Sequence, residues 1–123
     1  MTLPIPSQLE SPPEELCKID GVVGILFQRG GRLVINDMPF DDDKSERIGI
    51  LAQQLCEGFR KSRRLLRQVL FGYSEGVLLV QSRDDAQLVL FLMGETDLNL
   101  ASKAAHDYLA DQFKTRLRLP SLA

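Results

Sequence analysis

The chain has 123 residues, 44% of them hydrophobic, and a formal net charge of -2 with an isoelectric point near 5.4. This length and apolar content suit one compact domain whose core needs neither disulfides nor a metal. The small negative charge excludes a general attraction to nucleic acid or anionic membranes, and the apolar runs fall far short of the roughly 20 residues that span a bilayer. The composition therefore favours a protein or a small molecule as partner, with no nucleic acid and no membrane insertion.

The two ends of the chain and its cysteines set the expected boundaries and compartment. Residues 1–10 hold two of the six prolines and little that could pack, so we expect a flexible tail, a single domain over residues 11–118 and a short tail at 119–123. The first residues lack the basic and apolar segments of a signal peptide. Cys17 and Cys56 form no metal-binding pair, which predicts reduced thiols in a cytoplasmic protein.

A short helix is predicted after the first tail. The stretch from Ser11 to Glu14 has the pattern of a capping box, with a serine N-cap, prolines at the helix start and a glutamate three residues on. We expect this helix to reach about Ile19 and to turn Leu16 and Ile19 inward.

Two strands, residues 22–28 and 32–38, are predicted next. Both stretches are rich in β-branched and aromatic residues, and the Gly30-Gly31 pair between them can supply the positive φ angles of a tight hairpin turn. Apolar side chains alternate onto both faces of the first strand. We therefore expect the sheet to be covered on both sides.

A long central helix is predicted over residues 41–64. Its acidic start and basic finish complement the helix dipole, and its apolar residues recur at helical spacing. The stripe expected to face the sheet consists of Ile48, Leu51, Ala52, Leu55 and Phe59. Ile50 projects to the opposite side, among polar residues, so we expect this helix to have a second contact surface.

Three further strands are predicted over residues 65–73, 76–81 and 87–93. Short polar turns join them, as in a meander of adjacent antiparallel strands. A final helix is expected to begin at a cap formed by Asp97 or Asn99 and to reach about Leu117. Its predicted apolar side consists of Leu100, Ala101, Ala104, Ala105, Tyr108, Leu109 and Phe113.

This order of elements predicts an α+β fold. A five-stranded antiparallel sheet that is apolar on both faces needs helices on both faces, which gives a three-layer domain. We expect two helices on one face and the long central helix on the other. One helix, about 10 Å wide, does not cover a sheet about 20 Å across, so something else should cover the remainder.

Catalytic and cofactor motifs are missing from the sequence. The one histidine, His106, has no second ligand or nucleophile at a useful spacing. The acidic run at residues 41–43 lacks the ligand pattern of a calcium loop, and no glycine cluster has the pattern of a phosphate-binding loop. The sequence predicts a binding module rather than an enzyme, with no cofactor and no metal.

The densest charge feature is a basic cluster formed by Arg60, Lys61, Arg63, Arg64 and Arg67. Three interpretations stay open: a complement to the helix dipole, a contact for an acidic protein surface, or a phosphate-binding patch. No aromatic residues are interleaved with the cluster, which disfavours nucleic acid.

Several ordered patterns extend over about residues 14–118. They are Ile19 to Gly24 before the first strand, Arg29 to Gly31 at the hairpin, Ser74 to Leu79, and Asp97 to Ala101 at the last helix. In this order they resemble the Roadblock (dynein light-chain) family, which includes bacterial regulators of small Ras-like GTPases.

The resemblance implies a Roadblock-like, profilin-like architecture and a homodimer. In such a dimer the third strand pairs with its mate across a twofold axis, and the central helices pack side by side. The implied dimer-interface residues are Ile50, Gln54, Glu57, Arg67, Val69 and Phe71. The implied partner-binding residues are Arg47, Lys61 and Arg64.

The implied function is that of a non-catalytic adaptor or regulator that binds a small Ras-like GTPase. The alternative is a structural dimerisation scaffold within a larger cytosolic or motor-type complex, without dependence on a GTPase.

Overall fold

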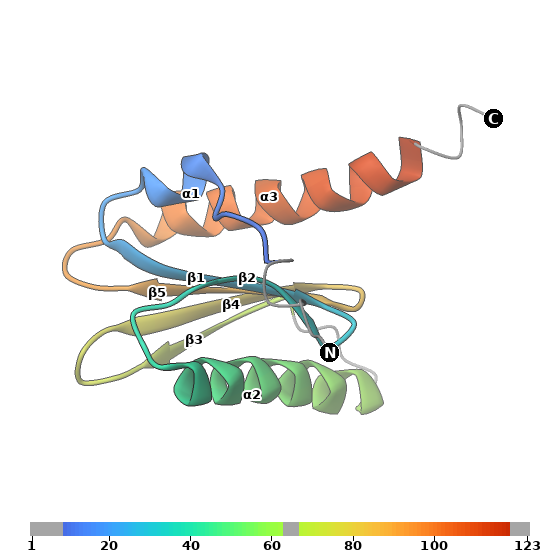
Figure 1. Ribbon diagram of the computed structural model, residues 1–123, viewed down its shortest axis with the longest axis horizontal. Coiled ribbons are helices and arrows are strands. Elements are labelled where there is room, and N and C mark those ends of the chain that lie inside the picture. Colours follow the sequence, from blue (N-terminus) through green and yellow to red (C-terminus); the bar gives the residue numbers. More distant parts are fainter. Residues whose placement is uncertain (1–8, 63–66, 119–123) are drawn as a thin grey trace, which may run out of the picture.

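The computed structural model describes residues 9–62 and 67–118, with side chains up to Phe113. The elements of this described part are α1 (Glu14–Cys17), β1 (Val22–Arg29), β2 (Arg32–Asp37), α2 (Asp42–Lys61), β3 (Gln68–Gly72), β4 (Val77–Arg83), β5 (Ala86–Leu92) and α3 (Leu98–Arg118). They lie in three layers, with α1 and α3 on one face of the sheet and α2 on the other (Figure 1). The predicted α+β architecture is confirmed.

Within the described ranges the sheet has five strands in the order β2-β1-β5-β4-β3, and every neighbouring pair is antiparallel. The predicted hairpin of β1 and β2 and the predicted meander of β3, β4 and β5 therefore join through β1 and β5. This order leaves β2 and β3 at the two edges of the sheet.

The two hairpin turns at one end of the sheet have the predicted turn chemistry. Gly30 and Gly31 have φ angles of 59° and 77°, the left-handed values that a tight two-residue turn requires. Asp84 in the β4–β5 turn has φ 53°, which aspartate tolerates better than most side chains. The N–H of Gly30 donates to the carbonyl of Asp85 at 2.9 Å, which ties the two turns together.

The larger of two hydrophobic cores lies between the sheet and the α1/α3 layer. Its buried residues are Leu16, Ile19, Ile25, Phe27, Ile35, Leu79, Ala86, Leu88, Leu90, Leu92, Ala101, Ala105, Tyr108 and Leu109. The rings of Phe27 and Tyr108 meet edge to face with centroids 5.3 Å apart. Ala101 and Ala105, which belong to the predicted apolar side, are fully buried, so these small side chains let α3 approach the sheet closely.

The smaller core lies under α2 and contains a buried polar contact. Its buried apolar residues are Leu26, Ile48, Ala52, Leu78, Val80, Val89 and Phe91. The side-chain amide of Gln28 donates to the carbonyl of Gly49 at 2.7 Å and to Oε1 of Gln87 at 2.9 Å. A Cβ at position 49 would lie 2.6 Å from Oε1 of Gln28, so glycine allows this close approach of helix and strand.

The ends of α2 are specified as the charge pattern predicted. Oδ1 of the N-cap residue Asp41 accepts a hydrogen bond from the N–H of Lys44 at 2.8 Å. Arg60 and Lys61 occupy the last turn, where the carbonyl end of the helix dipole favours cations.

Two leucines predicted to face the core are exposed. Leu51 is 44% exposed and Leu100 is 51% exposed. The buried stripe of α2 consists of Ser45, Ile48, Gly49, Ala52 and Cys56. Because these small residues lie closest to the sheet, the helix is rotated about its axis and Leu51 falls outside its contact face. Leu100 directly precedes the buried Ala101, about 100° away around α3.

The predicted capping box is also wrong. Pro13 occupies the N-cap of α1 in an extended conformation, without a side-chain hydrogen bond, and the helix has 4 residues. The chain before Pro13 contacts β2, because the N–H of Glu10 donates to the carbonyl of Val34 at 2.8 Å. Residues 1–8, 63–66 and 119–123, on which parts of the predicted tails, central helix and third strand fall, lie outside the described residues.

Candidate partner-binding surfaces

The outer edge of β3 is the first candidate surface. β3 pairs with β4, placing Val69 opposite Val80 and Phe71 opposite Leu78, and no described residue pairs with its other side. Val69 and Phe71 point toward the α2 layer and are half-buried, while Leu70 points to the opposite face and is 45% exposed. An edge strand with free main-chain groups and apolar side chains on both faces is a template for another strand.

The outward face of α2 is the second candidate surface. Of the residues predicted there, Arg47, Ile50, Gln54, Glu57 and Lys61 are all exposed, and at 100° per residue they share the side of the helix opposite its buried stripe. Ile50 is 49% exposed. The exposed Leu51 and Gly58 lie on the neighbouring side, so this surface is more apolar than the sequence predicted.

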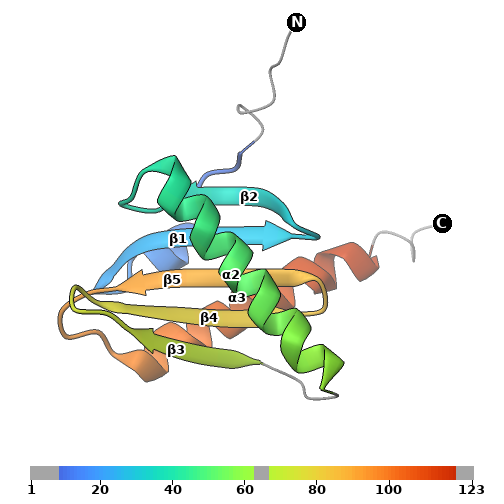
Figure 2. The ribbon, with the colours of Figure 1, turned by 90° about the horizontal axis from the view of Figure 1, so that it is seen from below.

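The two surfaces approach each other at one side of the molecule. Figure 2 shows α2 crossing the sheet diagonally, from β2 at its start to the β3 edge at its end. The last turn of α2 therefore lies near the beginning of the edge strand β3. Arg64, the remaining predicted contact residue, lies outside the described residues.

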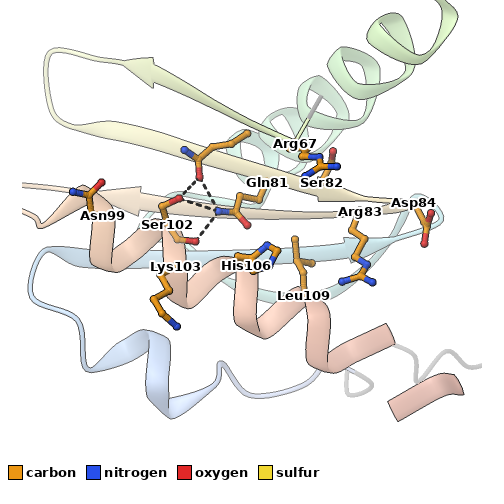
Figure 3. Close-up of a pocket in the computed structure, with 11 residues that line it drawn as sticks. Arg67, Gln81, Ser82, Arg83, Asp84, Asn99, Ser102, Lys103, His106 and Leu109 are labelled. Carbon is orange, nitrogen blue, oxygen red and sulfur yellow. Dashed lines mark hydrogen bonds between the residues drawn. The ribbon is translucent and has the colours of Figure 1, made fainter. Parts of the chain in front are cut away.

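A groove of about 760 Å³ lies on the other face of the sheet, between β4 and α3. The strand wall includes Arg67, Gln68, Gln81 and Arg83, and the helix wall includes Asn99, Ser102, Lys103 and His106 (Figure 3). His106 is exposed on α3.

A closed set of hydrogen bonds forms the floor of this groove. The amide nitrogen of Gln81 donates to Oε1 of Gln68 at 2.7 Å and to the carbonyl of Ser102 at 2.8 Å, and the Ser102 hydroxyl donates to Oε1 of Gln68 at 2.6 Å. Three elements, β3, β4 and α3, are thereby joined by polar side chains. Gln81 is 6% exposed, so its burial is compensated by these bonds.

The described residues offer little for catalysis. They contain no group of three or more metal-ligating side chains, and none of the described helices is long and apolar enough to cross a bilayer. Cys17 and Cys56 are free thiols. Burial raises the pKa of the Cys56 thiol, which favours the protonated and unreactive form. Burial likewise raises the pKa of Tyr108 to about 12, as expected for a core phenol.

Comparisons with known proteins identify the architecture. No family model and no curated protein matches the sequence. Among solved structures, a Roadblock/LC7 domain from Streptomyces avermitilis has a TM-score of 0.58 at 15% identity, over 78% of this chain and 92% of that one. The chain has the Roadblock/LC7 fold.

Two MglB proteins share this Roadblock/LC7 fold. Myxococcus xanthus MglB has a TM-score of 0.64 at 16% identity, covering 81% of this chain and 89% of its own. The gliding protein MglB from Thermus thermophilus has a TM-score of 0.58 at 13% identity, covering 76% of each chain. At these identities the comparisons establish the fold, and the function has to be argued from the surfaces.

Sequence reasoning missed three features of these surfaces. Leu51 and Leu70 add apolar area to the α2 face and the β3 edge, and the groove joins residues from separate elements. One signal in the sequence could have indicated the groove: Gln81 follows four apolar residues in β4, at a position where the alternation of the strand turns it to the same face as Leu79.

Proposed function

We propose that this chain is a non-catalytic homodimeric adaptor that binds a small Ras-like GTPase in the cytoplasm. The observation that carries this proposal is the outer edge of β3, which pairs with no described strand, beside the exposed apolar residues of α2. Half-buried Val69 and Phe71 lie at the rim of the smaller core, which one helix leaves partly uncovered. A second copy is the simplest partner for both features, because a twofold axis presents the same edge and the same helix face to each other.

In this dimer the β3 strands of the two copies pair antiparallel and extend the sheet across the twofold axis. Val69, Phe71 and Arg67 lie at the junction, while Ile50, Gln54 and Glu57 of the two α2 helices face each other. Stable interfaces bury about 800 Å² on each partner, and an edge strand plus one helix face supplies an area of this order. A solved neighbour described as MglB with a tetrameric arrangement is an example of self-association on this fold.

The GTPase contact is assigned to the basic residues of α2. Arg47 and Lys61 are exposed on the outward face, and Arg64 follows in the sequence. Charges of this kind at the rim of an interface steer association and fix orientation more than they add affinity. The GTPase-regulator branch that the sequence resembles is the support for this choice of partner. No arginine is assigned a catalytic role in GTP hydrolysis.

Co-purification tests the GTPase contact. Each small GTPase encoded in the same genome is loaded with GDP or with a non-hydrolysable GTP analogue and is passed over the immobilised protein. We expect one of them to bind in a nucleotide-dependent manner, and Arg47→Glu/Lys61→Glu to weaken binding at least tenfold. Lys18→Glu, an exposed reversal next to α1 on the other face, is the control and should have little effect.

Binding of no GTPase in either nucleotide state contradicts the proposal. Recovery of other proteins, without nucleotide dependence, favours the structural scaffold in a larger complex instead.

A further inference from the structure

The groove between β4 and α3 has no role in the GTPase contact, and it shares one residue, Arg67, with the proposed dimer junction. It opens on the sheet face opposite α2, and its helix wall comes from the first half of α3, which crosses behind β4 and β3 in Figure 2. The groove is therefore available whichever partner occupies α2.

The charge of the groove is opposite in sign to that of the whole chain. The described residues lining it include three cations, Arg67, Arg83 and Lys103, and one acid, Asp84. His106 lies between the two walls and adds a further nitrogen donor. Lys103 is paired with Asp107 at 2.9 Å, but both side chains are more than half exposed, and such pairs exchange partners at little cost. A basic groove on a chain of net charge -2 selects an anionic ligand.

The length of the groove fits an extended chain. Its helix wall runs from Asn99 to Leu109, which spans about 15 Å at 1.5 Å per residue. An extended peptide advances about 3.3 Å per residue, so roughly five residues fill this length. A pocket for a small molecule encloses most of its ligand. Figure 3 shows Arg67 and Arg83 on the strand wall and Lys103 on α3, its side chain extending away from the strands, so the cations stand apart along the groove and do not surround one point.

The floor adds neutral donors to the cations. Both hydrogen bonds to Gln68 from described residues use its Oε1, so its amide N–H groups stay available. The side-chain amide of Asn99 stands at the entrance of the groove (Figure 3). Carboxylates accept from guanidinium, ammonium and amide donors together.

We infer that this groove binds an extended acidic segment, about five residues long, of a partner protein. Carboxylates of the segment contact Arg83 and Arg67 on the strand wall and Lys103 and His106 on the helix wall. Leu109, which is buried at the far end, supplies an apolar contact for a side chain between the acids. The binding site does not use the outward face of α2, and of the residues assigned to the dimer junction it uses only Arg67.

A seven-residue peptide library displayed on phage is the probe. Selection against the wild-type protein should enrich peptides with several Asp or Glu residues. The affinity of the selected peptide, made synthetically, is then measured by fluorescence anisotropy for the wild type and for Lys103→Glu/His106→Gln, which reverses the charge at one exposed position and removes the imidazole at another. We expect at least a tenfold weaker affinity for this variant and less than a twofold change for Lys61→Glu, a matched reversal on α2.

Amide chemical shifts of the isotope-labelled wild-type protein give a second measurement that does not depend on a variant. The winning peptide should move the signals of β4 and of the first half of α3 and leave those of α2 in place.

Three outcomes overturn the inference: no acidic enrichment, equal affinity for the groove variant and the wild type, or shifts confined to α2. Loss of GTPase binding in the co-purification leaves these measurements unaffected, because none of the groove substitutions lies on α2 or β3.

Discussion

The two faces of the sheet are covered in different ways. On the α1/α3 face, large apolar side chains such as Phe27 and Leu88 are sealed by a long helix and a short one. On the α2 face one helix crosses diagonally, rests on small residues and a buried amide pair, and leaves Val69 and Phe71 half-buried. We therefore expect the first face to supply most of the stability of the single chain, while in the proposed dimer a second copy completes the second face.

The largest effect should come from the sealed face. Phe27→Ala removes a ring that is 1% exposed and packs edge to face on Tyr108, so we expect a loss of about 3–5 kcal/mol in the free energy of unfolding. Urea denaturation followed by circular dichroism measures it. A loss below about 1 kcal/mol would show that the α1/α3 core is not the main source of stability.

A substitution on the α2 face should dissociate the proposed dimer and leave the single chain folded. Phe71→Asp puts a charge at the β3 edge, and we expect the dimer dissociation constant to rise about 100-fold or more, since a buried unpaired charge at an interface costs several kcal/mol. Light scattering at several concentrations measures this constant. Leu100→Asp, at a position that is 51% exposed on α3, is the control and should remain dimeric; a dimeric Phe71→Asp protein places the interface elsewhere.

Two glycines of α2 test how closely the helix rests on the sheet. Gly49→Ala forces a Cβ against Gln28, whose amide is held by two hydrogen bonds, and should destabilise the fold by about 1–2 kcal/mol. Gly58→Ala meets no atom within 4 Å and should stabilise it by about 0.5–1 kcal/mol through helix propensity. The midpoint temperature of thermal unfolding is measured for both variants. Changes of the same sign in the two midpoints would contradict the close contact at Gly49.

The smallest effect should come from the misplaced leucine. Leu51→Ala removes a side chain that is 44% exposed, so we expect the free energy of unfolding to change by no more than about 0.5 kcal/mol. Ile48→Ala, on the buried stripe of the same helix, should cost about 2–4 kcal/mol. Equal losses in the free energy of unfolding for the two variants in urea denaturation would show that Leu51 packs against the sheet, as the sequence predicted.

Much of the fold follows from local patterns in the sequence. Gly30 and Gly31 specify the β1–β2 turn through their φ angles, and Asp41 with the cations of the last turn specifies the ends of α2. The rotation of α2 about its axis could not be predicted, because helical spacing alone allows either Leu51 or Ala52 to lie at the centre of the face toward the sheet. The choice depends on the contact of Gly49 with Gln28, which joins residues 21 positions apart.

The candidate surfaces also differ in how far local sequence patterns predict them. Ile50 could be singled out because one helix period places it opposite the apolar stripe. For the groove, the sequence offered Gln81 alone as a signal, because Gln68, Gln81 and Ser102 come from three elements whose order in space is set by the packing of α3 on β4. Periodicity predicts which face of an element is polar, and the packing decides which polar faces meet.

The mass of the wild-type protein in solution tests the central claim most directly. Multi-angle light scattering at high micromolar concentration should give twice the 13.8 kDa of one chain, because a second copy completes the α2 face and the β3 edge. A mass of 13.8 kDa at that concentration would contradict the account, since the edge of β3 and Ile50 of α2 would then be exposed without a second copy to cover them.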